Sequence, residues 1–141
     1  MGKLEDRVAV ITAATSGMAL ATAKLFVEEG AYVFITGRRQ DKLAEAVKTI
    51  GRNVTGVQGD ASNLDDLNRL YDTVKREKGR IDVLFASAGR GEFAKIGEVN
   101  EKHFDDIFDL NVRGTFIHCP KSAAVVSRWW LDHHERLDLR H

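Results

Sequence analysis

Residues 7–30, RVAVITAATSGMALATAKLFVEEG, decide the fold. The apolar run 7–12 predicts a buried strand. A turn of small residues follows, and 17–29 has the pattern of a helix that Gly30 ends. A strand, a tight turn and a helix in this order point several unpaired N–H groups and the positive helix end at one place. The stretch therefore predicts a phosphate-binding turn, with an ordinary strand-to-helix turn as the alternative.

The rest of the chain continues the alternation of strands and helices. Further strands are expected at 32–36, 54–57 and 81–86, and further helices at 41–50, at 62–78 and from a cap at Asn100. Helices of this length between strands predict right-handed crossovers and a parallel sheet that is covered on both faces. The sequence therefore predicts a doubly wound α/β domain.

Two of the helices carry expectations about capping and packing. Ser62 and Asp65 resemble a capping box at the start of the helix 62–78. Apolar residues at helical spacing are expected to face the core; they are Leu67, Leu70 and Val74 in that helix and Phe104, Ile107 and Phe108 in the helix that follows Asn100.

Composition excludes several classes of protein. With 141 residues, 43% of them hydrophobic and 30% charged, the chain is typical of one globular domain. Its 21 basic and 21 acidic side chains cancel, which removes the positive charge expected of a nucleic-acid binder. No apolar run approaches the roughly 20 residues of a membrane span, and the N-terminus has no apolar signal core. We therefore expect a cytoplasmic protein that contacts neither membranes nor nucleic acids.

Cysteine and histidine indicate neither a disulfide nor a metal site. Cys119 is the only cysteine, so it cannot form an internal disulfide. His133 and His134 are adjacent and would point to different sides of a helix. His118 has no acid placed to complete a catalytic triad. No metal is expected.

The phosphate-binding turn lacks glycines that such turns usually contain. Thr12, Thr15, Ser16 and Gly17 fit the role, but Ala13 and Ala19 stand where glycine is expected because the backbone adopts positive φ or touches the ligand. A side chain forced into left-handed geometry costs about 1–2 kcal/mol. We therefore expect dinucleotide binding to be weakened rather than lost.

The residues after the second strand bear on the choice of dinucleotide. NAD-binding domains usually carry an acid about 20 residues past the glycine turn, where it holds the ribose 2′-hydroxyl. Gly37 stands at that point here, and Arg38 and Arg39 follow it. Their forked N–H donors suit the 2′-phosphate of NADP, although two surface arginines with no ligand would look the same in the sequence.

Taken together, these features resemble the short-chain dehydrogenase/reductase family in its classical NADP-preferring type, over about residues 7–115. The TGxxxGxG turn of the family takes the form TAATSGMA here, and its NADP-type strand end is TGRR. Its third-strand aspartate matches Asp60 in VQGDAS, its NNAG segment takes the form ASAG at 86–89, and its helix asparagine matches Asn111 in FDDIFDLNVRG.

The resemblance implies a partial Rossmann-like parallel sheet with the strand order 3-2-1-4, without the later strands, and NADP as cofactor. It implies a catalytic role for Asn111. It assigns cofactor contacts to Thr12, Ala13, Thr15, Ser16, Gly17, Met18, Arg38, Arg39, Asp60, Ala61, Ser87, Ala88 and Gly89.

The departures from the family pattern concern its chemistry. Ser87 replaces an asparagine, which keeps a hydrogen-bonding group. The family also uses a serine on the fifth strand and a YxxxK pair on the next helix. The only YxxxK here is Tyr71 to Lys75, on the third helix and away from the strand ends where cofactors bind, so we expect Tyr71 to be structural. Tyr32 opens the second strand and is also expected to be structural.

Residues 119–141 change in character, starting with Cys119 and Pro120. We expect a partial dinucleotide-binding domain over 1–118 and an atypical helical tail over 119–141. The tail resembles the family's helix after the catalytic lysine, with Lys121 as a remnant of that lysine, which suggests a truncated or internally deleted chain. A frameshifted or unrelated tail is the alternative.

Three functions follow as hypotheses. The first is an NADP-dependent oxidoreductase by descent, which moves a hydride between the cofactor and a carbonyl or alcohol and has little or no activity without the serine and tyrosine. The second is a noncatalytic NADP(H)-binding module. The third is an interaction protein that forms homo-oligomers through the exposed fourth strand or through the tail, where Trp129 and Trp130 lie.

Overall fold

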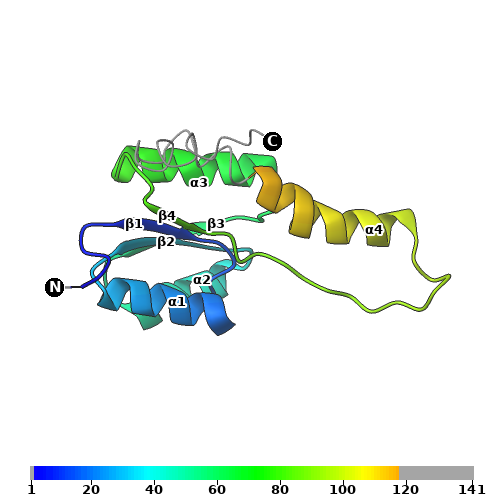
Figure 1. Ribbon diagram of the computed structural model, residues 1–141, viewed down its shortest axis with the longest axis horizontal. Helices are drawn as coiled ribbons and strands as arrows, with labels where there is room; N and C mark the ends of the chain where they lie inside the picture. The colour runs from blue at the N-terminus through cyan, green and yellow to red at the C-terminus, as the bar shows by residue number, and fades with distance from the viewer. Residues whose placement is uncertain (1, 118–141) are drawn as a thin grey trace, which may run out of the picture.

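The structure, a computed structural model, describes residues 2–117. Its centre is a four-stranded parallel sheet with the order β3-β2-β1-β4 (Figure 1). The strands are β1 (Val8–Ile11), β2 (Tyr32–Gly37), β3 (Val54–Gln58) and β4 (Val83–Phe85). The predicted fold class and strand order are confirmed. β4 is shorter than the expected strand, because three of its residues pair with β1.

Helices cover both faces of the sheet, as doubly wound topology requires. The covering helices are α1 (Gly17–Glu28), α2 (Gln40–Ile50) and α3 (Leu64–Glu77). A further helix, α4 (Glu101–Phe108), is continued by a π-helix, Asp109–Gly114. Figure 1 shows α1 and α2 below the sheet and α3 above it. Right-handed crossovers place α1 and α2 on one face, and α3 lies on the other because the chain returns past β1 to β4 after β3.

The core divides between the two faces according to the alternation of side chains along a strand. In β1, Ala9 and Ile11 pack with α1 and α2, whereas Val8 and Val10 pack toward α3. Successive side chains of a strand point to opposite faces, so a continuous apolar run such as VAVI supplies both cores.

The stripe expected on α3 is confirmed, but its expected cap is wrong. Leu67, Leu70 and Val74 are buried. The N-cap is Asn63, whose side-chain oxygen accepts hydrogen bonds from the N–H groups of Asp65 at 2.9 Å and Asp66 at 3.1 Å. Ser62 faces the preceding turn instead, where its N–H and hydroxyl both donate to Asp60.

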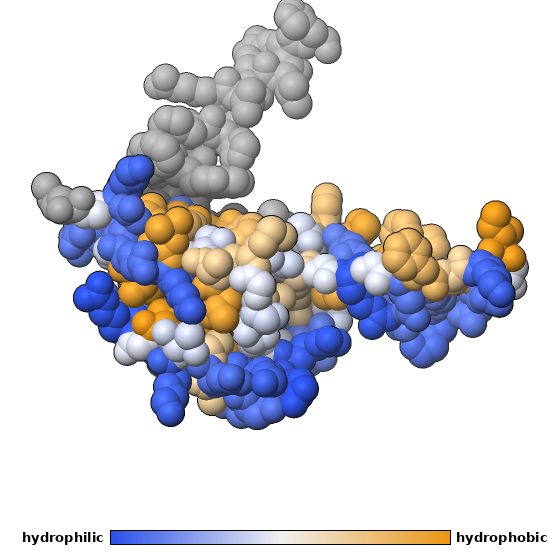
Figure 2. Space-filling view, turned by 90° about the horizontal axis from the view of Figure 1, so that it is seen from below, coloured by the Kyte–Doolittle hydropathy of each residue, from blue (hydrophilic) through white to orange (hydrophobic). Residues whose placement is uncertain are grey.

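The inward packing expected for α4 is wrong for its two phenylalanines. Phe104 is 52% exposed and Phe108 is 45% exposed, while Ile107 is half-buried. Figure 1 shows α4 and the loop before it extending away from the sheet, so the described residues place no second layer over this face. The two rings stack on each other with centroids 4.1 Å apart. Hydrophobic surface along this arm is visible in Figure 2.

The expectations for the tail, from His118 to His134, lie outside the described residues. Within residues 2–117, no helix has the length and apolar character needed to span a bilayer.

Candidate functional site

A pocket of about 320 Å³ lies where the carboxyl ends of the strands meet. This volume is within the range of roughly 300–1,000 Å³ that is common for small-molecule sites. Five separate segments line it, and the predicted residues among them are Ala13, Thr15, Ser16, Arg38, Asp60, Ala61, Ser87, Ala88 and Gly89. The loops that the sequence analysis selected one by one therefore meet at one place.

The amino end of α1 borders this pocket, and no capping side chain or acid of the described chain pairs with its backbone N–H groups. Ser16 is the N-cap, but its side chain makes no capping hydrogen bond, and the first turn contains no acid. Within residues 2–117 no acceptor receives the N–H groups of Gly17 and Met18. Met18 itself is 85% exposed. The helix end is therefore free to bind an anion.

Each of the other α-helices of the described chain has a capping side chain, an acid in its first turn, or both. Asn63 caps α3, which also carries Asp65 and Asp66 in its first turn. Asn100 caps α4, which begins with Glu101. In α2, Asp41 supplies a negative charge in the first turn. Only at α1, among these four, is the positive helix end left without a cap or an acid.

Two buried threonines hold the loops around the pocket in place. Thr12 is 1% exposed, and its hydroxyl oxygen accepts the N–H groups of Ser87 at 3.1 Å and Ala88 at 3.2 Å. Thr36 accepts the N–H of Ala13 through its side chain at 3.2 Å. Thr12 therefore supports the pocket from beneath and does not line it.

The two alanines that replace expected glycines behave differently. Ala13 has a φ of +52°, so it occupies the left-handed geometry that the sequence predicted. Ala19 does not: it lies inside α1, is 4% exposed and packs in the core. The expectation that Ala19 stands at a ligand-touching or positive-φ position is wrong, because Gly17, with a φ of +62°, takes the left-handed turn into the helix.

Arg38 and Arg39 also have different surroundings. Arg39 is bound to Asp41 through both oxygens of the carboxylate, at 3.2 and 2.7 Å, and this guanidinium lowers the pKa of Asp41. Arg38 lines the pocket and makes no ion pair with any residue in 2–117. Its guanidinium is therefore the one of the two that is available to a ligand.

The position of Gly37 disfavours a side chain at this strand end. A Cβ added there would lie 2.3 Å from the Cγ2 methyl of Thr15. An acid at this position would therefore need the Thr15 side chain to move.

Asn111 fastens the loop after β4 to the π-helix. Its Nδ2 donates to the carbonyl of Arg90 at 2.7 Å, and its Oδ1 accepts the N–H of Arg90 at 3.0 Å. A Cβ at Gly89 would lie 2.8 Å from the same Oδ1, so the loop approaches closely. The structure thus gives Asn111 a positioning role, and its catalytic role stays a prediction.

Comparison with known proteins bears on the origin of this arrangement. The family model described as short chain dehydrogenase matches residues 7–128. The chain belongs to this family. Members of the short-chain dehydrogenase/reductase family use nicotinamide cofactors.

Several relatives are similar over most of this chain. An oxidoreductase of Sarocladium schorii, asL5, is 44% identical over 113 residues, which cover 80% of this chain and 45% of that protein. The uncharacterized oxidoreductase YxbG of Bacillus subtilis is 39% identical over 127 residues, or 86% of this chain and 45% of that one. The chain spans about half the length of these curated relatives.

A solved structure shows the same fold. The crystal structure of a Brucella melitensis short-chain dehydrogenase/reductase, titled glucose/ribitol dehydrogenase, superposes with a TM-score of 0.85 at 25% sequence identity. The match covers 90% of this chain and 55% of that one.

Tyr71, the only candidate for the family's tyrosine by spacing, is far from the pocket. It is 4% exposed and packs on the α3 side of the sheet with Phe34 and Val74. Tyr32 lies at the amino end of β2, where its hydroxyl contacts Thr55. Both tyrosines have the structural placement that the sequence predicted.

Sequence reasoning missed several residues that also line the pocket: Thr36, Gly59, Arg90 and Leu110. Three of them belong to or adjoin a motif at a strand end, since Thr36 opens TGRR, Gly59 precedes Asp60 and Arg90 follows ASAG. Adjacency to a strand end was the available signal. Leu110 precedes Asn111 but lies on the π-helix, where this signal does not apply.

Proposed function

We propose that this chain binds NADP(H) in the pocket at the carboxyl ends of the strands, as the cofactor-binding part of a short-chain dehydrogenase/reductase. The observation that carries the proposal is the uncapped amino end of α1, whose free N–H groups border a pocket that Arg38 also lines. An anionic dinucleotide would supply the charge and the acceptors that this helix end lacks.

The residues present fit such a cofactor. The N–H groups of Gly17 and Met18 and the hydroxyl of Ser16 would hold the diphosphate, and Arg38 would bind the 2′-phosphate. By the family resemblance, Asp60 and Ala61 would lie at the adenine, with Ser87, Ala88 and Gly89 along the ribose. When bound, the nicotinamide cofactor supplies or accepts a hydride at a carbonyl or alcohol carbon.

We further propose that the 141-residue chain has little turnover. A proton donor must reach the reacting oxygen, and general acid–base help is typically worth about 10²–10⁴-fold in rate. Tyr71 is buried in the opposite layer and Tyr32 lies at the other end of the sheet. Within residues 2–117, Asn111 is the only one of the family's four catalytic positions with a counterpart near the pocket. The substrate, the cytoplasmic location and the truncated origin of the chain stay predictions.

A noncatalytic NADP(H)-binding module is the second candidate. The lack of a tyrosine near the pocket within residues 2–117 favours this candidate too. Cofactor binding would not require catalysis, because buried groups such as Thr12 hold the loops around the pocket.

Isothermal titration with NADPH and NADH tests the proposal. We expect the wild-type chain to prefer NADPH by about tenfold or more, which is the effect of one charge-assisted contact to the 2′-phosphate. Arg38→Ala should remove this preference, and Arg39→Ala should reduce it less, because Arg39 is already paired with Asp41. Arg52→Ala changes an exposed arginine at the opposite end of the sheet and serves as the matched control. An unchanged preference in Arg38→Ala would show that the arginine argument is wrong.

A hydride-transfer assay over a panel of ketones and alcohols separates the two candidates. Turnover that Asn111→Ala abolishes and Tyr71→Phe does not affect would reveal an active enzyme with a different proton donor. Cofactor binding without turnover would support the noncatalytic module.

A further inference from the structure

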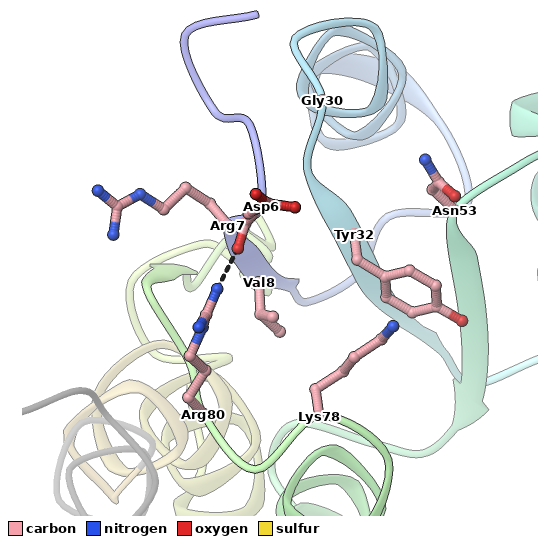
Figure 3. A pocket seen from close by; sticks show the side chains of 8 residues that line it. All are labelled: Asp6, Arg7, Val8, Gly30, Tyr32, Asn53, Lys78 and Arg80. Carbon is pink, nitrogen blue, oxygen red and sulfur yellow. Dashed lines mark hydrogen bonds between the residues drawn. The ribbon is translucent and has the colours of Figure 1, made fainter.

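A second pocket, of about 550 Å³, lies at the amino ends of the strands, opposite the proposed NADP(H) pocket. Residues around it include Asp6, Val8, Tyr32, Asn53, Lys78 and Arg80, which come from β1, β2, the turn before β3 and the segment after α3 (Figure 3). None of these residues takes part in the function proposed above.

Arg80 is fixed at one side of this pocket by a buried carboxylate. Asp82 has a side chain that is 7% exposed, and it accepts hydrogen bonds from Arg80 Nε at 3.1 Å and from the N–H of Val8 at 2.8 Å. Arg7 completes the pairing of Asp82 at 3.4 Å, and Figure 3 shows its side chain directed away from the cavity. One terminal nitrogen of Arg80 also donates to the carbonyl of Asp6. The other terminal nitrogen has no acceptor within residues 2–117.

Lys78 stands at the other side of the pocket without an anionic partner in the described chain. Its Nζ lies 3.8 Å from the centre of the Tyr32 ring, which holds it by a cation–π contact. The ring is fixed in turn by a 2.8 Å contact between its hydroxyl and Thr55. The N–H donors of this ammonium group that point away from the ring are available to a ligand.

The end of α3 does not by itself account for these cations. Basic residues at a helix carboxyl end are favourable against the macrodipole, but Lys75 and Arg76 already occupy the last turn of α3. Lys78 and Arg80 follow the helix and lie on two sides of the cavity; Figure 3 shows the Arg80 side chain directed toward Asp6 and the Lys78 side chain toward the Tyr32 ring.

We propose that this pocket binds a small soluble molecule that carries a phosphate group. The phosphate would lie between the free nitrogen of Arg80 and Nζ of Lys78, which combine a planar fork with a point charge. Val8 offers an apolar surface for the uncharged part of the molecule. The proposal is independent of NADP(H) binding, because the two pockets share no residue.

Titration of the ¹⁵N-labelled chain with inorganic phosphate, followed by backbone amide shifts, tests this site. We expect saturable shifts at Asn53, Lys78 and Arg80. Lys78→Gln should weaken the binding that produces these shifts by about tenfold, and Lys78→Arg, which keeps the charge, should retain it. Lys75→Gln is the matched control, since it removes an exposed lysine one turn earlier on α3.

Three results would overturn the proposal. They are the absence of saturable shifts at Asn53, Lys78 and Arg80, an equal loss of affinity in the Lys75→Gln and Lys78→Gln chains, and phosphate shifts confined to the start of α1. A separate arm tests a lipid headgroup as the source of the phosphate. Sedimentation of the chain with phosphatidate vesicles, but not with phosphatidylcholine vesicles, combined with no response to free phosphate, would reject a small soluble ligand.

Discussion

Apolar side chains are buried in the centre of the sheet but exposed in the arm beyond β4, which consists of α4 and the loop before it. Phe34 and Ile35 in β2 are fully buried, whereas Phe93 and Ile96 in the loop before α4 are fully exposed. Both regions are rich in apolar residues, but only the centre has helices on both faces (Figure 1). Apolar residues therefore form a core here only where the described chain supplies a neighbouring layer. The proposed cofactor pocket lies at the boundary between the two regions.

The largest expected difference between the two regions is in how much the loss of one aromatic ring lowers global stability. Phe34→Ala should lower the free energy of unfolding by about 3–5 kcal/mol, because it leaves a cavity beneath α3. Phe93→Ala removes an equal ring from the exposed loop and should change it by less than about 0.5 kcal/mol. Denaturant unfolding measures both. Similar losses in the two variants would show that the loop is packed in solution.

The connection between the regions depends on Asn111. Asn111→Ala removes two hydrogen bonds to the backbone of Arg90 and should cost about 1–3 kcal/mol in local stability. Hydrogen exchange at the Arg90 amide should accelerate, while the amides of β1 keep their protection. Slow exchange at Arg90 in the variant would mean that other contacts hold the loop.

The exposed arm should promote self-association. Replacing both Phe104 and Phe108 by serine removes the stacked pair from the α4 surface and should raise the dissociation constant of any oligomer by about tenfold. Sedimentation velocity over a range of concentrations measures this change. Lys102→Ser on the same helix is the control. A monomeric wild-type chain at every concentration would contradict this prediction.

The smallest expected effect on stability concerns the carboxylate of Asp66, in the first turn of α3. The N–H of Asp60, and then Arg69, lower the pKa of Asp66 below its usual 3.8. A lowered folded-state pKa stabilises the protein above pH 3.8, and this contribution is lost as the pH falls through the folded value. Asp66→Asn should therefore cost less than about 1 kcal/mol at neutral pH, with the difference from wild type disappearing in acid. A difference that persists below the folded pKa would contradict the linkage.

Much of the sheet could be predicted because apolar periodicity and turn residues report local structure. The parallel sheet followed from the alternation of strands and helices, and its strand order followed from the family resemblance. The convergence of Ser16, Asp60 and Ser87 followed from parallel topology. The predictions that failed for α4 depended on whether another part of the chain lies against the helix. Helical spacing marked Phe104 and Phe108 as a face, but it could not say whether anything covers that face.

Other errors had local causes that a motif does not encode. Ser62 and Asn63 are adjacent, and both residue types are common helix caps. Asn63 caps α3 because the hydroxyl of Ser62 donates to Asp60 instead. Arg38 and Arg39 look equivalent in sequence, yet Asp41 engages only the second. Ala19 matched a glycine position of the motif, but it lies inside α1 and its side chain packs in the protein core.

The most direct measurement of the central claim is the change in backbone amide shifts when NADPH is added to the ¹⁵N-labelled chain. We expect the largest changes at Gly17 and Met18 and along 87–89, with the Lys78 amide unaffected by NADPH at concentrations that saturate the cofactor pocket. Unchanged amides at Gly17 and Met18 in saturating NADPH would contradict it.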